Sequence, residues 1–497
     1  MAEADRFRRK KETVRPLKHF SKLSKASVLL VNPWIDDFAA YDFWMKPLGL
    51  LIIGRILRDS GYSISLLDCL DRCHPRLLKY LGRTSAESRS DGTGRFIKTF
   101  IDKPAVLEHV PRRFGRYGMP EAVVRGILDE QPEPDVIFVT SGMTYWYTGV
   151  TGMITLLKSR FPEVPVVLGG IYASLCTDHA RQFSGADYVV PGAGEAVVPG
   201  MVHQLTGCDP APQYHREPDD YLHAGYDLYS GIESAAILTS RGCPYQCPFC
   251  GSRLLDGAFR QKEPDDVAEE VFRLSRSAGI RHLAFYDDAL LINKETHLKP
   301  VLREVIRRPL NLAFHTPNGL HPKEIDNELA NLMFQSRFVT IRLSYESSSQ
   351  TRQRQMGLKV CDGDIEKALT SLENAGYRRG DVACYVLMGL PGQPLDEVLD
   401  SLSFILGLGA RVSLAAFSPV PGTRCWMEAV QSGVMDENAD PLLANNTVFT
   451  CETSEVTYDT FFQLGTVTAE SNRLLSRGGN PLRDDGIRAI LKRIKQS

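Results

Sequence analysis

The sequence predicts an α/β fold in which a doubly wound parallel sheet is followed by a partial (β/α)6 barrel of the TIM type. Short apolar runs such as SVLLVNP, starting at Ser27, alternate with segments of helical length through most of the chain. A polar stretch rich in Pro and Tyr interrupts this alternation at about residues 205–232, and we interpret it as a linker. With 497 residues, the chain is long enough for two or three domains.

The first unit is predicted at residues 27–204 as a Rossmann-like sheet, because parallel strands require crossover helices. Such sheets bind ligands beyond the carboxyl ends of their strands. Within this unit, residues 72–132 lack the strand–helix alternation and are too long for a plain connection, which indicates an insertion or lid. Residues 1–26 form a basic tail that we expect to be solvated rather than to bind nucleic acid.

The second unit is predicted at residues 233–425, where six strand-then-helix steps occur in succession. Six steps are too few for a closed eight-unit barrel, so we expect a partial barrel that is open on one side. Its site should lie at the carboxyl ends of the strands, as in complete barrels. Residues 426–497 are predicted to be mostly helical and to cover the open side.

Composition restricts the classes of function. The formal net charge of −2 provides no overall basic field for nucleic acid or for membranes. No apolar stretch approaches the roughly 18 residues that span a bilayer, and the N-terminus lacks the apolar core of a signal peptide. We therefore expect a cytoplasmic protein, in which the 11 cysteines do not form a disulfide framework.

Three of these cysteines form the motif RGCPYQCPFC, in which Cys243, Cys247 and Cys250 have C-x3-C-x2-C spacing. A structural zinc site needs four ligands, and no fourth cysteine or histidine follows at the usual spacing. A 4Fe–4S cluster is held by cysteine thiolates, one for each iron, so three cysteines leave one iron free to bind a small molecule. Zinc binding, or three structural thiols, are the alternatives.

The motif, with the aromatic Phe249 before its last cysteine and its place after the first barrel strand, resembles the radical S-adenosylmethionine (SAM) superfamily. The resemblance implies that the unligated iron chelates the amino and carboxylate groups of SAM. It also implies that one electron from the cluster cleaves SAM to methionine and a 5′-deoxyadenosyl radical. An electron donor such as flavodoxin or ferredoxin is the implied partner.

The same resemblance implies further SAM contacts at the strand ends. In FYDD, Asp287 or Asp288 would accept from the SAM ammonium, although either could instead cap the next helix. In SYES, Glu346 would accept from the ribose, and Lys359 or its competitor Arg354 would face the carboxylate. The implied SAM contacts are Phe249, Asp287, Asp288, Glu346, Lys359 and Gly389, the last in the GLPG turn beside adenine. His315, at the end of the third strand, is a candidate for facing the substrate, with a structural role as the alternative.

A doubly wound unit placed before such a barrel resembles the cobalamin-binding (class B) methyltransferase group of the superfamily. The matching segments are VTSGMTY, VLGGIYAS and DYVVPGAGE. The implied cobalamin contacts are Thr140, Ser141, Gly142, Tyr145, Trp146, Gly169, Gly170, Gly192, Gly194 and Glu195. The D-x-H-x-x-G motif that supplies a histidine below cobalt is absent, so we expect cobalamin without a histidine lower ligand. A vestigial cobalamin domain is the alternative.

The resemblance implies cobalamin-dependent methylation of an unactivated carbon, with a 4Fe–4S cluster, SAM and cobalamin as cofactors. Two alternatives stay open. One is a radical SAM cyclase, oxidase or rearrangement enzyme, and the other is a non-catalytic iron–sulfur redox or sensor protein. The sequence does not specify the substrate.

Overall fold

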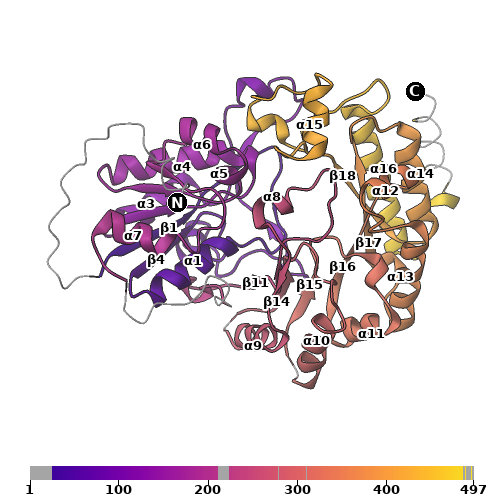
Figure 1. Cartoon of the computed structure of the whole chain (residues 1–497), viewed down its shortest axis with the longest axis horizontal. Helices are drawn as coiled ribbons and strands as arrows, with labels where there is room; N and C mark the ends of the chain where they lie inside the picture. The colour runs from indigo at the N-terminus through magenta and orange to yellow at the C-terminus, as the bar shows by residue number, and fades with distance from the viewer. Residues whose placement is uncertain are drawn as a thin grey trace, which may run out of the picture.

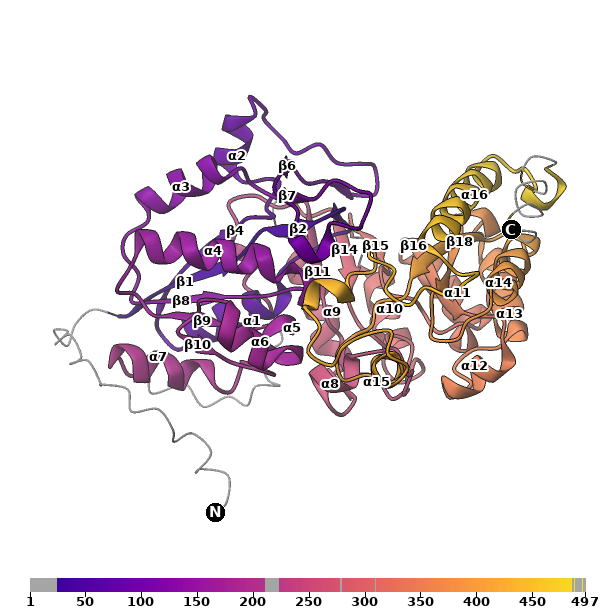
Figure 2. The same ribbon diagram turned by 90° about the horizontal axis from the view of Figure 1, so that it is seen from above.

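A computed structural model describes residues 25–210, 223–277, 279–308, 310–484, 487 and 494. Nearly all of the predicted basic tail and the middle of the predicted linker therefore lie outside the described residues. The remaining chain forms an N-terminal α/β unit that lies beside a second α/β unit (Figure 1). Seen from above in Figure 2, the C-terminal segment with α15 lies in front of the barrel strands and returns toward the first unit.

The first unit is built on a five-stranded sheet in the order β10-β9-β8-β1-β4, in which every pairing is parallel. Its strands are β1 (Ser27–Asn32), β4 (Ser63–Asp68), β8 (Val136–Val139), β9 (Val166–Leu168) and β10 (Tyr188–Val189). The strand order reverses between β1 and β8, and doubly wound sheets place their ligands at such a point.

Helices cover both faces of this sheet because its strands are apolar on both sides. Helices α1 (Leu48–Asp59) and α7 (Val198–Thr206) pack on one face, in a core that includes Leu30 and Val202. On the other face, α3 (Glu121–Glu130) and α4 (Tyr147–Arg160) pack in a second core. Two shorter helices, α5 (Ile171–Leu175) and α6 (Thr177–Phe183), connect β9 to β10.

Residues 72–132 contain several small elements. They are α2 (Pro75–Tyr80), β5 (Gly94–Arg95), β6 (Lys98–Phe100), β7 (Gly115–Tyr117) and α3, which leads directly to β8. Strand β7 pairs with β6 and with β2 (Ile35–Asp37), while β5 pairs with β3 (Tyr41–Asp42). The segment is therefore a folded layer attached to the strand ends of the first sheet.

The second unit is a six-stranded parallel sheet in the order β11-β14-β15-β16-β17-β18, which is the predicted partial barrel. Its strands are β11 (Ser234–Ile237), β14 (His282–Phe285), β15 (Ala313–His315), β16 (Phe338–Glu346), β17 (Val382–Met388) and β18 (Arg411–Ala416). The outer helices are α9 (Pro264–Ser275), α10 (Leu298–Arg307), α11 (Asn327–Gln335), α13 (Asp362–Ala375) and α14 (Leu395–Gly407). These elements confirm the predicted fold class.

The partial barrel has two edge strands, and one side chain covers each of them. The Tyr226 hydroxyl accepts from the Ala236 N–H at 2.7 Å and donates to the Ala236 carbonyl at 2.6 Å. On β18, the Asn472 amide accepts from the Val412 N–H at 2.9 Å and donates to its carbonyl at 2.7 Å. Unpaired edge groups invite pairing with another chain, and these side chains satisfy the groups of Ala236 and Val412 instead.

Short elements complete the chain. They are α8 (Ser252–Asp256), α12 (Gln350–Gln355), α15 (Arg424–Gln431), α16 (Tyr458–Ser476) and the hairpin of β12 (Ser240–Arg241) with β13 (Arg260–Gln261). Helix α16 packs against β18, while the segment between α15 and α16 is largely irregular. That segment contacts the first unit, where the Asn445 amide donates to the buried Asp37 carboxylate at 2.9 Å. No helix in the described ranges is long and apolar enough to cross a membrane.

Candidate functional site

The three clustered cysteines lie in the cluster loop (residues 242–251) between β12 and α8. The loop begins at Gly242, whose φ of 73° suits glycine, and the Cys250 N–H donates to the Cys247 carbonyl at 3.1 Å. All three thiols are free; Cys250 is exposed, and Cys243 and Cys247 are half-buried. The Cys250 sulfur lies 3.1 Å from the Ser252 hydroxyl.

The three thiols are not gathered around a single point in the described part of the chain. Among the described residues, no three His, Cys, Asp or Glu side chains converge closely enough to hold one ion. A 4Fe–4S cluster takes one thiolate per iron, so its ligand sulfurs stand further apart than those around one ion. Burial raises the pKa of Cys247 to about 11, and the Lys359 ammonium acts against this. Because metal ligands must be deprotonated, iron binding would release protons from this loop.

Lys359 and Glu346 form a buried ion pair beside the cluster loop. The Lys359 ammonium lies 2.9 Å from Glu346 Oε1, and the two side chains are only 6% and 8% exposed. The second oxygen, Oε2, is buried without a hydrogen-bond partner, and the backbone of Glu346 has a positive φ of 65°. Burial by itself would lower the pKa of Lys359. The nearby Glu346 carboxylate and the cysteines raise it by a larger amount, so the net shift is upward. A strained residue with an unpartnered buried oxygen suits a position that contacts a ligand.

The ammonium of Lys359 also lies 5.7 Å from the centre of the Phe249 ring, which connects the pair to the cluster loop. Arg354, the competing candidate, is exposed on α12. Of the two bases, Lys359 is the one that the structure places beside the cysteines.

The two adjacent aspartates have different environments. Asp287 is buried and accepts from the Thr239 N–H at 3.0 Å, the Thr239 hydroxyl at 2.8 Å and the Ser240 hydroxyl at 2.6 Å. Its oxygens thus connect the ends of β14 and β11, and it is not free for a ligand. Asp288 is exposed as a whole residue, but neighbouring atoms partly desolvate its carboxylate and raise its pKa, and a hydrogen bond from Ser252 opposes this rise. Asp288 is therefore the aspartate available to a ligand.

Gly389 begins the turn after β17 with a φ of 91°. Its N–H donates to the Gln393 side chain at 2.9 Å, and a Cβ at this position would lie 3.0 Å from the Phe449 ring. The turn thus requires glycine for its backbone and for its contact with the C-terminal segment.

Of the two roles open to His315, facing a substrate or a structural one, its surroundings favour the structural role. His315 is fully buried, and its ring stacks on Trp44 with 3.9 Å between centroids. Its ring nitrogens lie 3.0 Å from His282 Nδ1 and 3.0 Å from the Thr340 hydroxyl. Burial, with a contribution from His282, lowers its pKa to about 3, so it is a neutral core residue. The sequence could not reveal Trp44, which the first unit inserts into the barrel.

A cavity of about 270 Å³, the edge cavity, lies at the carboxyl ends of β8, β9 and β10. Six of the predicted cobalamin contacts line it: Thr140, Gly169, Gly170, Gly192, Gly194 and Glu195. At Gly170 the φ is 93°, and a Cβ would lie 2.4 Å from the Ser141 carbonyl oxygen. The glycines therefore keep this edge open and let a ligand approach the backbone.

The edge cavity reaches the second unit. Arg241, Leu255 and Asp256, which flank the cluster loop, line its far wall. Arg241 forms an ion pair with Glu195 between the two units. Sequence reasoning missed Arg241 and Asp256, although Arg241 is the first residue of the motif RGCPYQCPFC.

The other predicted cobalamin contacts do not line the edge cavity. The Ser141 hydroxyl donates to the Gly169 carbonyl at 2.7 Å and supports the cavity wall from behind. The Trp146 indole donates to the buried Asp37 carboxylate at 2.8 Å. Tyr145 is buried against the Trp146 ring, and a Cβ at Gly142 would lie 2.8 Å from the same ring. Gly142, Tyr145 and Trp146 thus stabilise the junction with the C-terminal segment, and their contact with a corrin stays a prediction.

No histidine lines the edge cavity. His179 lies 2.7 Å from the Tyr172 hydroxyl, and His74 caps α2 by accepting from the Arg76 N–H at 3.2 Å. The expected absence of a histidine lower ligand therefore stays a prediction that the lining residues support.

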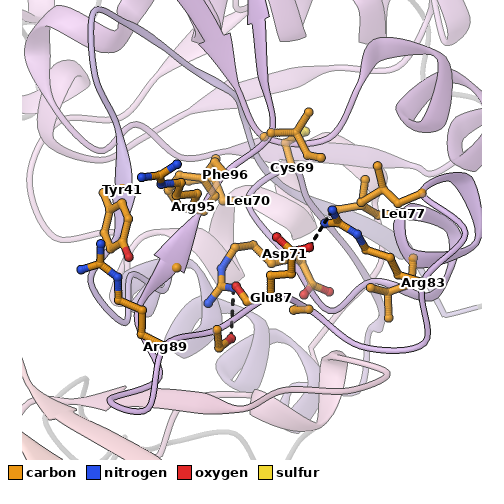
Figure 3. Close-up of a pocket in the computed structure, with 18 residues that line it drawn as sticks. Tyr41, Cys69, Leu70, Asp71, Leu77, Arg83, Glu87, Arg89, Arg95 and Phe96 are labelled. Atoms are coloured by element: carbon orange, nitrogen blue, oxygen red, sulfur yellow. Dashed lines mark hydrogen bonds and ion pairs between the residues drawn. The ribbon is translucent and has the colours of Figure 1, made fainter.

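A second cavity, of about 320 Å³, lies where β4 ends and is formed with residues 77–97 (Figure 3). Figure 3 shows Arg89 and Arg95 near Tyr41, and Arg83 on the opposite side near Leu77. Arg72 pairs with Asp42 at 2.8 Å and Arg83 with Glu87 at 2.8 Å. Protein carboxylates thus neutralise two of the four arginines that line this second cavity. The cavity lies apart from the cluster loop.

Comparison with known proteins identifies both units. Residues 237–405 match the radical SAM superfamily, and residues 113–202 match the B12 binding domain. The chain thus joins a B12-binding domain to a radical SAM domain, as the motif and the sheet predicted.

The chain is also similar to individual methyltransferases. The radical S-adenosylmethionine methyltransferase TsrM from Kitasatospora setae, whose structure holds cobalamin and a 4Fe–4S cluster, superposes with a TM-score of 0.59 and 15% identity. This match covers 95% of the present chain and 100% of TsrM. A cytidylyl-2-hydroxyethylphosphonate methyltransferase of Streptomyces wedmorensis is 22% identical over 82% of each chain. An uncharacterised methyltransferase of Pyrococcus horikoshii is 23% identical over 61% of this chain and 71% of its own.

Proposed function

We propose that the protein is a radical SAM enzyme that methylates an unactivated carbon with the help of cobalamin. The observation that carries the proposal is the shared wall of the edge cavity. The glycine-rich strand ends of the B12-binding domain face Arg241 and Asp256, which flank the cluster loop. When bound, a 4Fe–4S cluster supplies the electron that cleaves SAM, and cobalamin supplies the methyl group.

The residues of the barrel mouth have separate roles in this proposal. Cys243, Cys247 and Cys250 hold the cluster. Lys359 faces the SAM carboxylate, and Glu346, with its unpartnered Oε2, accepts from the ribose. Asp288 accepts from the SAM ammonium, because Asp287 is already occupied by Thr239 and Ser240.

The residues of the first unit bind and orient the second cofactor. Gly169, Gly170 and Gly192 let its nucleotide tail approach the backbone at the ends of β9 and β10. The Glu195–Arg241 ion pair fixes the spacing between the two units, because the Glu195 carboxylate is almost fully buried. Contact between the two units also excludes water from the space between the cofactors.

The proposal is tested with the full chain after anaerobic reconstitution of iron and sulfide in the presence of cobalamin. We expect a bound corrin absorption band and, with SAM and a reductant, formation of both 5′-deoxyadenosine and S-adenosylhomocysteine. The second product reports methyl transfer from SAM. Cys247→Ala should lose the iron–sulfur absorption and 5′-deoxyadenosine but keep the corrin, since Cys247 does not line the edge cavity.

The outcomes separate the alternatives. Formation of 5′-deoxyadenosine without a corrin and without S-adenosylhomocysteine would indicate a non-methylating radical SAM enzyme. Absence of 5′-deoxyadenosine from a fully loaded protein would contradict both enzymatic functions and favour a redox or sensor protein.

A further inference from the structure

A third cavity lies at the opposite end of the barrel from the cluster loop. It has a volume of about 560 Å³ and is formed where β14 to β18 begin; we call it the amino-end cavity. Residues 90–91 of the first unit form part of its wall, so both units enclose it. None of its lining residues belongs to the cluster loop or to the edge cavity.

Four arginines line the amino-end cavity: Arg281, Arg337, Arg342 and Arg411. None of these four arginines forms an ion pair within the described part of the chain. Several other arginines of the described chain do pair with carboxylates. Arg342 donates to the Tyr385 hydroxyl at 2.6 Å, and Arg281 donates to the neighbouring Ile280 carbonyl at 2.9 Å. Their positive charges are thus not neutralised by protein carboxylates.

Arg411, at the start of β18, is the most constrained of the four. One of its terminal nitrogens donates to the Asp381 carbonyl at 2.6 Å, but its Nε is buried without an acceptor. Burial lowers its pKa; the Asp381 carboxylate raises it, and Arg342 and Arg378 lower it. A buried guanidinium N–H without an acceptor is unfavourable, so Arg411 is held in the cavity wall at a cost and with its charge unpaired.

The carboxylates of the cavity are engaged elsewhere. Asp381 pairs with Arg378 at 2.8 Å, and Asp91 accepts from the Thr93 hydroxyl at 2.7 Å and from its N–H at 3.0 Å. The adjoining His282 has a lowered pKa, principally because of burial, and adds no positive charge near neutral pH. The four guanidiniums therefore determine the sign of the local potential.

The wall from the first unit is closely packed. A Cβ at Gly92 would lie 2.4 Å from the His282 ring, and the Trp44 indole donates to the Asp91 carbonyl at 2.7 Å. Trp44 also stacks on His315 of the barrel. Contacts at this wall therefore attach the first unit to the barrel. A ligand bound here would contact both units at once.

We propose that the amino-end cavity is an anion site that binds a small molecule carrying a diphosphate group. Four guanidiniums can donate paired hydrogen bonds to adjacent phosphates, which arginine matches in geometry. The volume exceeds what one phosphate needs and leaves space for an attached organic group. Binding stabilises the contact between the two units through residues 90–91 and the arginines. The inference does not depend on the proposed methyl transfer.

The test uses the full chain and inorganic pyrophosphate as the probe, with titration calorimetry and thermal melting at constant ionic strength. We expect saturable binding with a dissociation constant below 1 mM and a rise in melting temperature. Arg337→Gln, at an exposed residue whose side chain forms no hydrogen bond with the described residues, and Arg411→Gln should each weaken binding at least tenfold. Arg307→Gln, an exposed arginine on α10 that pairs with Glu304, is the matched control and should leave binding unchanged.

Two results would overturn the proposal. One is the absence of specific binding: either pyrophosphate does not bind, or Arg307→Gln weakens its binding as much as the cavity variants do. Equal weakening by the control would indicate nonspecific attraction to the protein surface. The other is tighter binding of citrate than of pyrophosphate, which would assign the cavity to a polycarboxylate. Arg337→Gln keeps the test decisive if Arg411→Gln fails to fold.

Discussion

Replacing Lys359 by Met should destabilise the barrel strongly, because it leaves the buried Glu346 carboxylate without a donor. Glu346 Oε1 has the Lys359 ammonium at 2.9 Å as its hydrogen-bond donor, and Oε2 has none. Both side chains are more than nine-tenths buried, so solvent cannot compensate. Breaking a buried pair by removing one partner costs about 3–5 kcal/mol. For a unit of this size, that is a fall of roughly 6–20 °C in melting temperature.

The assay is thermal unfolding without SAM, followed by circular dichroism. Lys158→Met is the matched control, because Lys158 pairs with Asp187 at 2.7 Å but both side chains are more than one-third exposed. It should cost less than about 1 kcal/mol. Replacing both members of the buried pair, with Glu346→Met added to Lys359→Met, should recover most of the loss. The reasoning is refuted if Lys359→Met melts like the control, or if the double variant is less stable than the single one.

Three further predictions concern the first unit and the barrel core. Gly170→Ala should abolish corrin binding and destabilise the protein, because its Cβ would lie 2.4 Å from a backbone oxygen at a φ of 93°. Gly200→Ala, with no atom within 4 Å, should be neutral or stabilise by up to about 1 kcal/mol; equal corrin binding by both variants would contradict this. Glu195→Gln should weaken corrin binding, measured by absorption, while iron content stays at the wild-type level, since its partner Arg241 joins the two units; loss of iron as well would argue against a purely positioning role. Since burial lowers the pKa of His315 to about 3, the unfolded chain binds a proton there that the folded chain does not. Stability should therefore fall as pH decreases from about 6.5 toward 3, by about 1.4 kcal/mol per pH unit for this histidine, and His315→Phe should reduce that slope in acid unfolding curves.

The strand–helix alternation and the cysteine motif are local patterns that can be recognised in the sequence. They predicted the radical SAM and B12-binding domains that the comparisons match. They could not distinguish Asp287 from Asp288, which are equivalent in sequence. The distinction depends on Thr239 and Ser240 at the end of a neighbouring strand, which occupy Asp287 alone. Similarly, Lys359 and Arg354 are both plausible by spacing, and only burial beside the cluster loop favours Lys359.

The sequence by itself determined the kind of chemistry, because three thiols at fixed spacing and glycines at strand ends act through their immediate neighbours in the chain. Tertiary structure alone decided how the parts meet. Glu195 and Arg241 are 46 positions apart, and Asp37 and Asn445 are 408 apart, yet each pair is in contact. Contacts of this kind depend on how whole sheets pack, and no periodicity or motif encodes them. For the same reason the arginines of the amino-end cavity, which come from the starts of separate strands, become a single site only in the folded barrel.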